Sequence, residues 1–138
     1  MSEQVLIDTG PLVAFLGAGS ELHEWTTEQT RRLTAPFLTT EPVLTETAHL
    51  LKRANLDADV LFELMGRGLL RVGLNIEHEQ KAIRQLLRRY RSVPMSLADA
   101  TLVRLSELRE RSIVFTLDSD FRIYRRFVRQ AIPLLMPD

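Results

Sequence analysis

Two carboxylates directly follow short apolar segments that predict buried β-strands. Asp8 follows residues 5–7, and Asp118 follows residues 113–117. Because ligands bind beyond the carboxyl ends of the strands in a parallel sheet, we expect both acids at that edge. Taken alone, each acid is equally well explained as a turn residue or a helix cap that accepts backbone N–H bonds. Two of them in one small chain favour a shared chemical site.

Two further acids lie on predicted helices. Glu46 has mostly apolar helical neighbours, so it is either part of a site or a boundary glutamate paired with an arginine. With His49 it forms one Glu-x-x-His pair, whereas a di-iron bundle needs two such pairs and two more glutamates. Asp99 follows Ser96 at the spacing of a capping box, which explains it structurally. A helix N-terminus is also a place where acids and phosphates gather.

The four acids suggest metal chemistry when they are considered together. Two carboxylates ~4 Å apart repel by about 4 kcal/mol at an effective dielectric constant of 20. A cluster of four is therefore unstable unless its members are protonated, paired or bound to cations. Hard oxygen ligands, in a chain with Cys 0, favour Mg²⁺ or Mn²⁺. Such ions activate water and stabilise the transition state of phosphodiester cleavage.

The elements that must position these acids alternate between strands and helices. Short apolar segments predict strands at 5–7, 37–39, 69–74, 113–117 and 132–135. Periodicity and cap residues predict helices at about 11–16, 20–33, 42–54, 57–66, 75–91, 96–110 and 120–129, with Ser20, Asp57 and Asn75 as possible caps. This alternation predicts an α/β fold in which helices cover both faces of a parallel sheet. We expect residues 1–138 to form one domain.

The basic residues are mostly arginines, although the chain has a formal net charge of +0. Only Lys52 and Lys81 are lysines, and the planar fork of arginine suits phosphate recognition. The densest runs are Arg84, Arg88, Arg89 and Arg91, and Arg122, Arg125, Arg126 and Arg129. They are either solvated helix faces or a phosphate-binding rim around the acids. Arg88, Arg89, Arg122 and Arg125 are the RNA-binding candidates.

Composition excludes several classes of protein. The absence of cysteine (Cys 0) excludes disulfides, thiolate metal sites and cysteine nucleophiles. The first residues lack the basic segment and apolar run of a secretory signal. No stretch approaches the ~18 apolar residues of a membrane span. We therefore expect a cytoplasmic protein without membrane contact.

Four short motifs together resemble the PIN domain family, and in particular the VapC-like toxins of type II toxin–antitoxin pairs. They are Val-Leu-Ile-Asp8-Thr-Gly-Pro-Leu, Leu-Thr-Glu46-Thr-Ala-His-Leu-Leu, Met-Ser-Leu-Ala-Asp99-Ala-Thr-Leu-Val and Val-Phe-Thr-Leu-Asp118-Ser-Asp120-Phe. Each motif is weak alone, but their order and spacing are fairly specific. The resemblance spans almost the whole chain. It implies an α/β/α sandwich with a mainly parallel sheet of about five strands.

The resemblance also implies a function and roles for individual residues. The function is metal-dependent endoribonuclease activity with Mg²⁺ or Mn²⁺. Asp8 and Asp99 would be the principal metal ligands, and Glu46 and Asp118 would complete the acidic cluster. Asp120 is a further candidate, and Thr9 and Thr116 would orient carboxylates or water. Toxins of this kind commonly form homodimers and are silenced by an antitoxin segment that enters the acidic groove.

Three other functions remain as alternatives. The first is a non-catalytic PIN protein that binds RNA or acts as a scaffold. The second is phosphoryl transfer through an aspartyl phosphate on Asp8, but the dehalogenase-type motif wants a second Asp where this chain has Gly10. The third is a glycosidase carboxylate pair. Nothing suggests the aromatic cleft that a sugar would need, since Trp25 is the only tryptophan and is expected to pack a helix.

Overall fold

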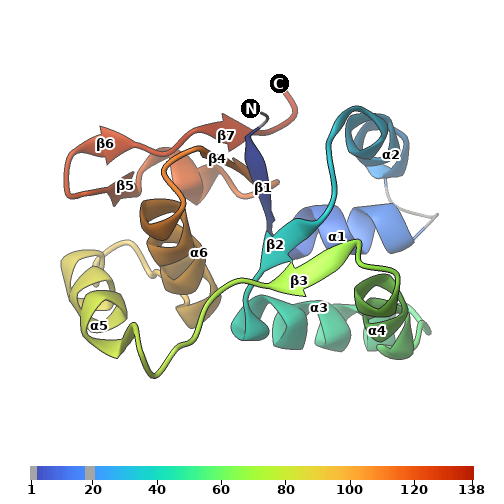
Figure 1. The fold of residues 1–138 in the computed structure, drawn as a ribbon, viewed down its shortest axis with the longest axis horizontal. Coiled ribbons are helices and arrows are strands. Elements are labelled where there is room, and N and C mark those ends of the chain that lie inside the picture. Colours follow the sequence, from blue (N-terminus) through green and yellow to red (C-terminus); the bar gives the residue numbers. More distant parts are fainter. Residues whose placement is uncertain (1–2, 18–20) are drawn as a thin grey trace.

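The computed structural model describes residues 3–17 and 21–138 (Figure 1). Strands and helices alternate along most of the chain, as the sequence predicts. In order, the elements are β1 (Gln4–Ile7), α1 (Thr9–Leu16), α2 (His23–Arg32), β2 (Phe37–Thr39), α3 (Glu41–Arg53), α4 (Asp59–Gly66), β3 (Leu70–Val72), α5 (Gln80–Arg89), α6 (Leu97–Leu108), β4 (Ser112–Phe115), the 3₁₀ turn η1 (Ser119–Arg122), β5 (Arg125–Arg126), β6 (Gln130–Ala131) and β7 (Leu134–Leu135).

Five strands form one parallel sheet in the order β3-β2-β1-β4-β7. The apolar strand β1 lies at its centre and pairs with β4 from Gln4↔Ser112 to Ile7↔Phe115. On the other side, Leu6 of β1 pairs with Leu38 of β2. Strands that are buried on both faces are continuous apolar runs, as β1 and β4 are. The predicted parallel sheet of about five strands is confirmed.

Helices cover both faces of this sheet. α1 and α2 lie on one side of the strands, and α5 and α6 lie on the other (Figure 1). Side chains from the central strands and from α6 are fully buried between these layers, as Leu6, Val114, Phe115 and Leu102 show. Trp25 of α2 packs edge-on against Phe115, with ring centroids 5.8 Å apart. The three-layer α/β arrangement predicted from the sequence is therefore confirmed.

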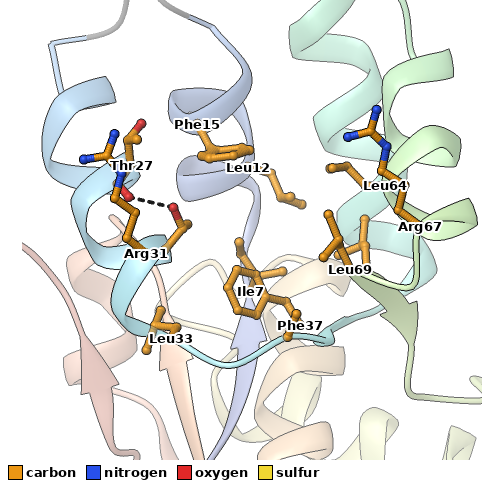
Figure 2. Close-up of a pocket in the computed structure, with 13 residues that line it drawn as sticks. Ile7, Leu12, Phe15, Thr27, Arg31, Leu33, Phe37, Leu64, Arg67 and Leu69 are labelled. Atoms are coloured by element: carbon orange, nitrogen blue, oxygen red, sulfur yellow. Dashed lines mark hydrogen bonds between the residues drawn. The ribbon is translucent and has the colours of Figure 1, made fainter.

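An apolar cavity of about 560 Å³ lies between α1, α2, α4 and the strands β1, β2 and β3 (Figure 2). Its lining consists of Ile7, Leu12, Phe15, Thr27, Thr30, Arg31, Leu33, Ala35, Phe37, Leu64, Arg67, Leu69 and Leu70. The arginines of this lining are paired within their own helices. Arg31 lies 3.6 Å from Glu28, and Arg67 lies 3.7 Å from Glu63. We name this space the apolar cavity.

The predicted helix at 120–129 is wrong over most of its length. The chain makes only the 3₁₀ turn η1 and then the antiparallel hairpin β5–β6, in which Arg125 pairs with Ala131 and Arg126 with Gln130. The local residues do not oppose a helix, so tertiary contacts decide the outcome. The Tyr124 ring packs edge-on against Tyr90 and Phe121, which fixes the chain in a non-helical path.

Several predicted boundaries also shift. The proposed cap Ser20 lies outside the described residues, and α2 begins at His23. Asn75 accepts a bond from the His78 backbone at 3.0 Å, so it starts a turn and α5 begins only at Gln80. Asp57 caps the Asp59 N–H at 2.9 Å, one residue before the assigned cap of α4.

Among the described residues, no helix combines the length and the apolar character needed to cross a bilayer.

Candidate active site

The ends of β1 and β4 bring two of the predicted acids together. Asp8 continues β1, and its backbone N–H donates to the Phe115 carbonyl at 3.0 Å. Because β1 and β4 are adjacent and parallel, Asp118 follows β4 at the same edge of the sheet. The strand-end argument from the sequence therefore holds for the positions of both acids.

Asp8 is a buried carboxylate held by two hydrogen bonds. Its Oδ2 accepts from the Thr116 hydroxyl at 2.7 Å, and its Oδ1 accepts from the Thr9 backbone at 2.8 Å. Burial, helped by the nearby Asp99 and Asp118, raises the pKa of Asp8 to about 6 against the lowering effect of the two hydrogen bonds. Near neutral pH the group is thus an anion in a place that disfavours one.

Asp99 is held at the start of α6. Its backbone N–H donates to Ser96 Oγ at 3.0 Å, and its Oδ2 accepts from the Ser96 N–H at 3.3 Å, so the predicted capping box forms. The same Oδ2 accepts from the Tyr124 hydroxyl at 2.9 Å. Burial raises the pKa of Asp99, Asp118 raises it further, and the bonds from Tyr124 and Ser96 lower it. The cap and the candidate site therefore use one carboxylate.

Glu46 lies on α3 and lines the same groove as Asp8 and Asp99. It is exposed, and its Oε2 accepts from the Thr9 hydroxyl at 3.2 Å. Thr9 follows Asp8 in the chain, so one residue ties the end of β1 to Glu46. The predicted orienting role of Thr9 has a matching contact, with Glu46 as its partner.

Asp118 and Asp120 lie on the turn after β4. The Asp118 backbone donates to Thr116 Oγ1 at 3.0 Å, and its Oδ1 accepts from the Asp120 N–H at 2.9 Å. The Thr116 hydroxyl thus donates to Asp8 and accepts from the Asp118 backbone. Thr116 is fully buried, and it sets the relative positions of the two strand-end acids.

These acids line one open groove of about 410 Å³, which we name the acidic groove. Its lining consists of Asp8, Thr9, Gly10, Glu46, Pro94, Ser96, Asp99, Leu117, Asp118 and Asp120. None of these five carboxylates belongs to an ion pair in the part of the chain that the structure describes. Oδ1 of Asp99, Oδ2 of Asp118 and Oε1 of Glu46 accept no hydrogen bond from any described residue. The groove gathers negative charge without compensating it.

The acidic groove offers the kind of ligand atoms that a hard divalent cation prefers, but these atoms are not at the distances of a formed metal site. Within residues 3–17 and 21–138, no three His, Asp or Glu side chains are close enough to hold an ion as they stand. Several free carboxylate oxygens and no thiolate are the ligand chemistry of Mg²⁺ or Mn²⁺.

Close packing shapes one wall of the acidic groove. A Cβ atom on Gly10 would lie 3.0 Å from Cβ and Cγ of Leu117, so glycine lets α1 approach the turn that carries Asp118. Sequence reasoning missed Tyr124, which donates to Asp99. No local signal marks this tyrosine, because its position inside an arginine-rich segment predicts a surface helix. Burial and Asp99 raise the pKa of Tyr124, which keeps it a hydrogen-bond donor.

The candidate RNA-binding arginines lie outside the groove lining. Arg88 and Arg89 are exposed at the end of α5, and Arg122 is exposed at the end of η1. Nη1 of Arg125 donates to the carbonyls of Arg122, Ile123 and Tyr124, so part of this guanidinium supports the loop. Their role in binding RNA stays a prediction.

Comparison with known proteins decides the family. The PIN domain family profile matches residues 5–126 of the chain, from β1 to β5. The chain belongs to the PIN domain family. The PIN fold is also that of VapC20 from Mycobacterium tuberculosis, whose crystal structure superposes with a TM-score of 0.75 at 22% identity over 94% of this chain and 100% of that one. VapC20 itself is a toxin that cleaves the sarcin-ricin loop.

The comparisons confirm the VapC-like PIN resemblance at the level of family and fold. The four motifs that carry the resemblance lie within the matched residues. No curated protein sequence matches the chain significantly. Residue roles in this PIN domain therefore rest on its own geometry.

Proposed function

We propose that this PIN domain is a divalent-metal-dependent endoribonuclease. One observation carries the proposal: carboxylates from four separate elements line one groove, and no cationic side chain lies among its lining residues. A structural role for each acid explains its hydrogen bonds but leaves unexplained why the acids share a groove. Two of them are buried, and their raised pKa values record the cost of this placement.

Each residue has a distinct task in this proposal. Asp8 and Asp99 would be the principal ligands of Mg²⁺ or Mn²⁺, and Glu46 and Asp118 would complete the set. A bound ion of this kind supplies Lewis acidity and an activated water for phosphodiester hydrolysis. Thr116 orients Asp8 and the Asp118 backbone, so that the two acids face the groove together.

The other supporting residues hold the remaining acids. Tyr124 and Ser96 fix one oxygen of Asp99 and leave the other free. Thr9 does the same for Glu46, at 3.2 Å. Asp120 shares the groove and is an alternative to Asp118 as a ligand. Fixing one oxygen of each acid in advance lowers the entropy lost when the ligands assemble.

The substrate that fits this proposal is single-stranded or looped RNA. The groove is open, and the exposed arginines on α5 and η1 would provide phosphate contacts. The toxin activity of VapC20 supports extending the proposal to a type II toxin with a cognate antitoxin. On the same basis we infer a homodimer that acts in the cytoplasm and a chain that works as one domain.

Cleavage of RNA by the purified protein tests the proposal. A mixed RNA pool is incubated with Mg²⁺ or Mn²⁺, and in parallel with a chelator. We expect cleavage only with metal, and none from Asp8→Asn or Asp99→Asn. Cleavage that persists in chelator or in both variants would contradict the assignment.

A second candidate is a non-catalytic PIN protein that binds RNA or acts as a scaffold. The observation that favours it is the spacing of the acids, since no three of the described side chains form a ready ion site. Calorimetry with millimolar Mg²⁺ and Mn²⁺ separates the two candidates. Binding that disappears in Asp99→Asn supports the nuclease, and no binding by the intact protein supports the scaffold.

A further inference from the structure

The tip of the β5–β6 hairpin holds two apolar residues in a backbone conformation that such residues rarely adopt. Phe127 has φ 51° and Val128 has φ 69°, in the left-handed region. Valine is β-branched, so this conformation is strained. Both side chains nevertheless reach solvent, with exposed fractions of 46% and 57%. The fold thus accepts conformational strain to display two apolar groups that contribute little to the core.

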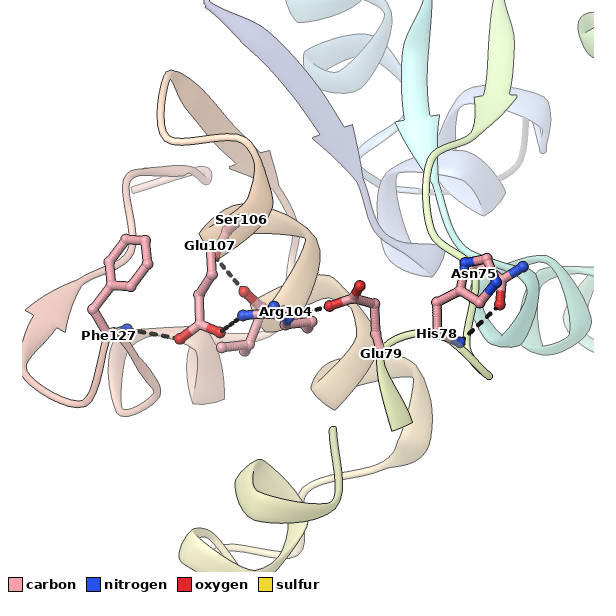
Figure 3. A network of polar contacts seen from close by, with 8 residues as sticks. Asn75, His78, Glu79, Arg104, Ser106, Glu107 and Phe127 are labelled. Carbon is pink, nitrogen blue, oxygen red and sulfur yellow. Dashed lines mark hydrogen bonds and ion pairs between the residues drawn. The ribbon is translucent and has the colours of Figure 1, made fainter. Parts of the chain in front are cut away.

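A polar network holds this tip in place (Figure 3). Glu107 of α6 accepts from the Phe127 backbone N–H at 2.7 Å through Oε2, and from Arg104 at 3.0 Å through Oε1. Arg104 also donates to Glu79 at 2.7 Å. Because Glu107 is itself fixed by Arg104, its bond to Phe127 holds the strained turn.

Arg126 provides a second anchor, at the C-terminal end of α6. It is 5% exposed, and its Nη1 donates to the carbonyls of Ser106 and Glu110 at 3.1 Å each. A cation is favourable at this end of a helix. The guanidinium carbon lies 5.9 Å from the centroid of the Phe127 ring. The hairpin is therefore fixed to the helix that carries Asp99 at its other end.

The chain segment that contains the tip is positively charged, and Glu107, the acid that contacts it, is paired with Arg104. Residues 121–137 include four arginines and neither Asp nor Glu, whereas the whole chain has a formal net charge of +0. Arg122 and Arg129, on either side of the tip, are exposed. An apolar pair flanked by exposed cations is suited to a polyanion with apolar faces, such as a nucleic acid.

The hairpin is linked to the acidic groove through the chain and through α6. Tyr124, whose hydroxyl donates to Asp99 at 2.9 Å, precedes Phe127 by three residues. Glu107, which holds Phe127, follows Asp99 on α6 by eight residues, which is about 12 Å along the helix axis. A strand of RNA with a phosphate in the groove would therefore bring a nucleotide a few positions away within reach of the tip.

We propose that the hairpin tip binds an unpaired base of the substrate RNA. Phe127 stacks on the base, Val128 packs beside it, and Arg122 and Arg129 contact the flanking phosphates. This inference rests on the proposed ribonuclease function and names the element that selects single-stranded substrate. Bases in a duplex are stacked on one another and are not available to the ring, whereas an unpaired base is.

The small size of the tip favours RNA over a protein partner. A stable protein interface uses about 20–30 residues on each side. Stacking on a base needs only one ring, and it gains from nearby arginines. Arginine's planar fork also suits phosphate. The tip, with two apolar residues and flanking arginines, is large enough to stack on a base but too small for a stable protein interface.

Binding of RNA to Phe127→Ala is the test. The probe is a fluorescein-labelled single-stranded RNA of mixed sequence, about 15 nucleotides long, and anisotropy is measured in EDTA so that cleavage cannot interfere. We expect the Kd to rise about fivefold or more, the loss typical of one stacked base. The matched control is Phe62→Ala on α4, since Phe62 is 65% exposed and far along the chain from the arginine cluster. Its Kd should equal that of the wild type.

Phe127→Trp provides a second, direct readout. Tryptophan should restore the affinity, and its fluorescence should be quenched when it stacks on a base. Trp25 gives a constant background, because it packs against Phe115 at the sheet. A fully paired duplex of the same sequence should bind wild type and Phe127→Ala equally and should cause no quenching.

The outcomes separate this inference from the proposed function. If wild type cleaves RNA with Mg²⁺ but Phe127→Ala binds the single strand as tightly as Phe62→Ala, the inference is wrong and the nuclease stands. If wild type neither cleaves nor binds any RNA, the proposed function fails and the inference fails with it. The inference is supported if Phe127→Ala, but not Phe62→Ala, binds the single strand more weakly and if the single strand quenches the fluorescence of Phe127→Trp.

Discussion

The acidic groove and the apolar cavity lie on opposite sides of one strand end. Ile7 lines the apolar cavity, and Asp8, the next residue, lines the acidic groove. Successive side chains of a strand point to opposite faces, so β1 serves both regions. The apolar cavity is the larger, at about 560 Å³ against about 410 Å³. Its lining is mostly apolar, and it contains no carboxylate; its two arginines lie within 3.7 Å of nearby glutamates.

Donor chemistry, and not volume, therefore identifies the candidate site. The apolar cavity is lined by side chains whose burial stabilises the fold, at about 25 cal/mol per Å². Two of the acids that line the acidic groove, Asp8 and Asp99, are buried, and the burial of a charged group costs stability. We expect substitutions in the two regions to separate stability from activity.

The largest expected effect is the loss of cleavage in Asp99→Asn. Asparagine keeps an oxygen for the Ser96 and Tyr124 bonds but removes the charge, so the helix start survives. We expect Mg²⁺-dependent RNA cleavage to fall at least about 100-fold, beyond the loss caused by a group that only supports a metal ligand. The control in the apolar cavity is Leu64→Met, which should keep cleavage within about twofold because volume is conserved. Equal losses would mean that the two regions do not differ in function.

The opposite result is expected for stability. Leu12 of the apolar cavity is 2% exposed, and Leu12→Ala should lower the free energy of unfolding by about 2–5 kcal/mol. Glu46→Gln in the acidic groove should change it by no more than about 0.5 kcal/mol, because Glu46 is exposed. Urea unfolding in EDTA measures both variants. A large loss in Glu46→Gln would show that the groove also carries stability.

Asp8→Asn should stabilise the protein without metal above pH 6. The folded pKa of about 6 exceeds the ordinary value of 3.8, so folding takes up a proton between these values. The stability that this group contributes is present below about pH 4 and is lost as the pH rises through 6. The loss in the free energy of unfolding is about 3 kcal/mol. Asparagine can accept only one of the two hydrogen bonds that Asp8 accepts, and the lost bond reduces the gain in stability by about 1 kcal/mol. We expect a net gain of about 2 kcal/mol by urea unfolding at pH 8, and none at pH 4.

Metal should reverse that order. With Mg²⁺ at millimolar concentration, the wild-type Tm should rise and the Asp8→Asn Tm should not, since binding stabilises only the protein that binds. A wild type that stays less stable than the variant at every Mg²⁺ concentration would argue against a metal site.

Metal affinity should depend on pH because Asp8 must be ionised to bind. Below about pH 6 the association constant for Mn²⁺ should rise about tenfold per pH unit, and it should level off above that value. Isothermal titration between pH 5 and 8 measures the profile. The raised pKa of Asp99 should make the rise steeper. A flat profile would mean that neither buried acid binds the ion.

The smallest effect is expected from Tyr124→Phe, which removes the hydroxyl that donates to Asp99. Hydrogen bonds to charged groups contribute about 1.5–3 kcal/mol, and Ser96 retains part of the positioning. Cleavage should fall about three- to tenfold. The pH profile should also move to higher pH, because this bond lowers the pKa of Asp99. A fall without that shift would indicate a purely structural role.

Sequence reasoning succeeded where the signal is local. The β1 segment is an apolar run that ends at an acid, and the capping box of Ser96 and Asp99 is set by a three-residue spacing. Both predictions are confirmed as structure. The family's four motifs placed the acids at one edge without any coordinates, although their catalytic and metal-binding roles stay predictions.

Sequence reasoning failed where contacts between residues distant in the chain determine the local structure. Residues 120–129 suit a helix locally, but Tyr124 bonds to Asp99 and packs on Tyr90, and the chain turns back as a hairpin. The helix period also does not say how wide the covered face is, and Leu50 on α3 is 37% exposed although it is apolar. Asn75 suits a helix cap, yet a turn precedes α5.

The double use of Asp99 has a genetic consequence. This residue both starts α6 and lines the groove, so most substitutions there damage folding and chemistry together. Glu46 is exposed and accepts a bond from the Thr9 hydroxyl, so under the proposed function we expect its loss to disarm the groove and leave a folded protein. In a selection for cells that survive a toxic protein, we expect intact but harmless variants to accumulate at position 46. At position 99, survivors other than Asp99→Asn should instead carry little folded protein.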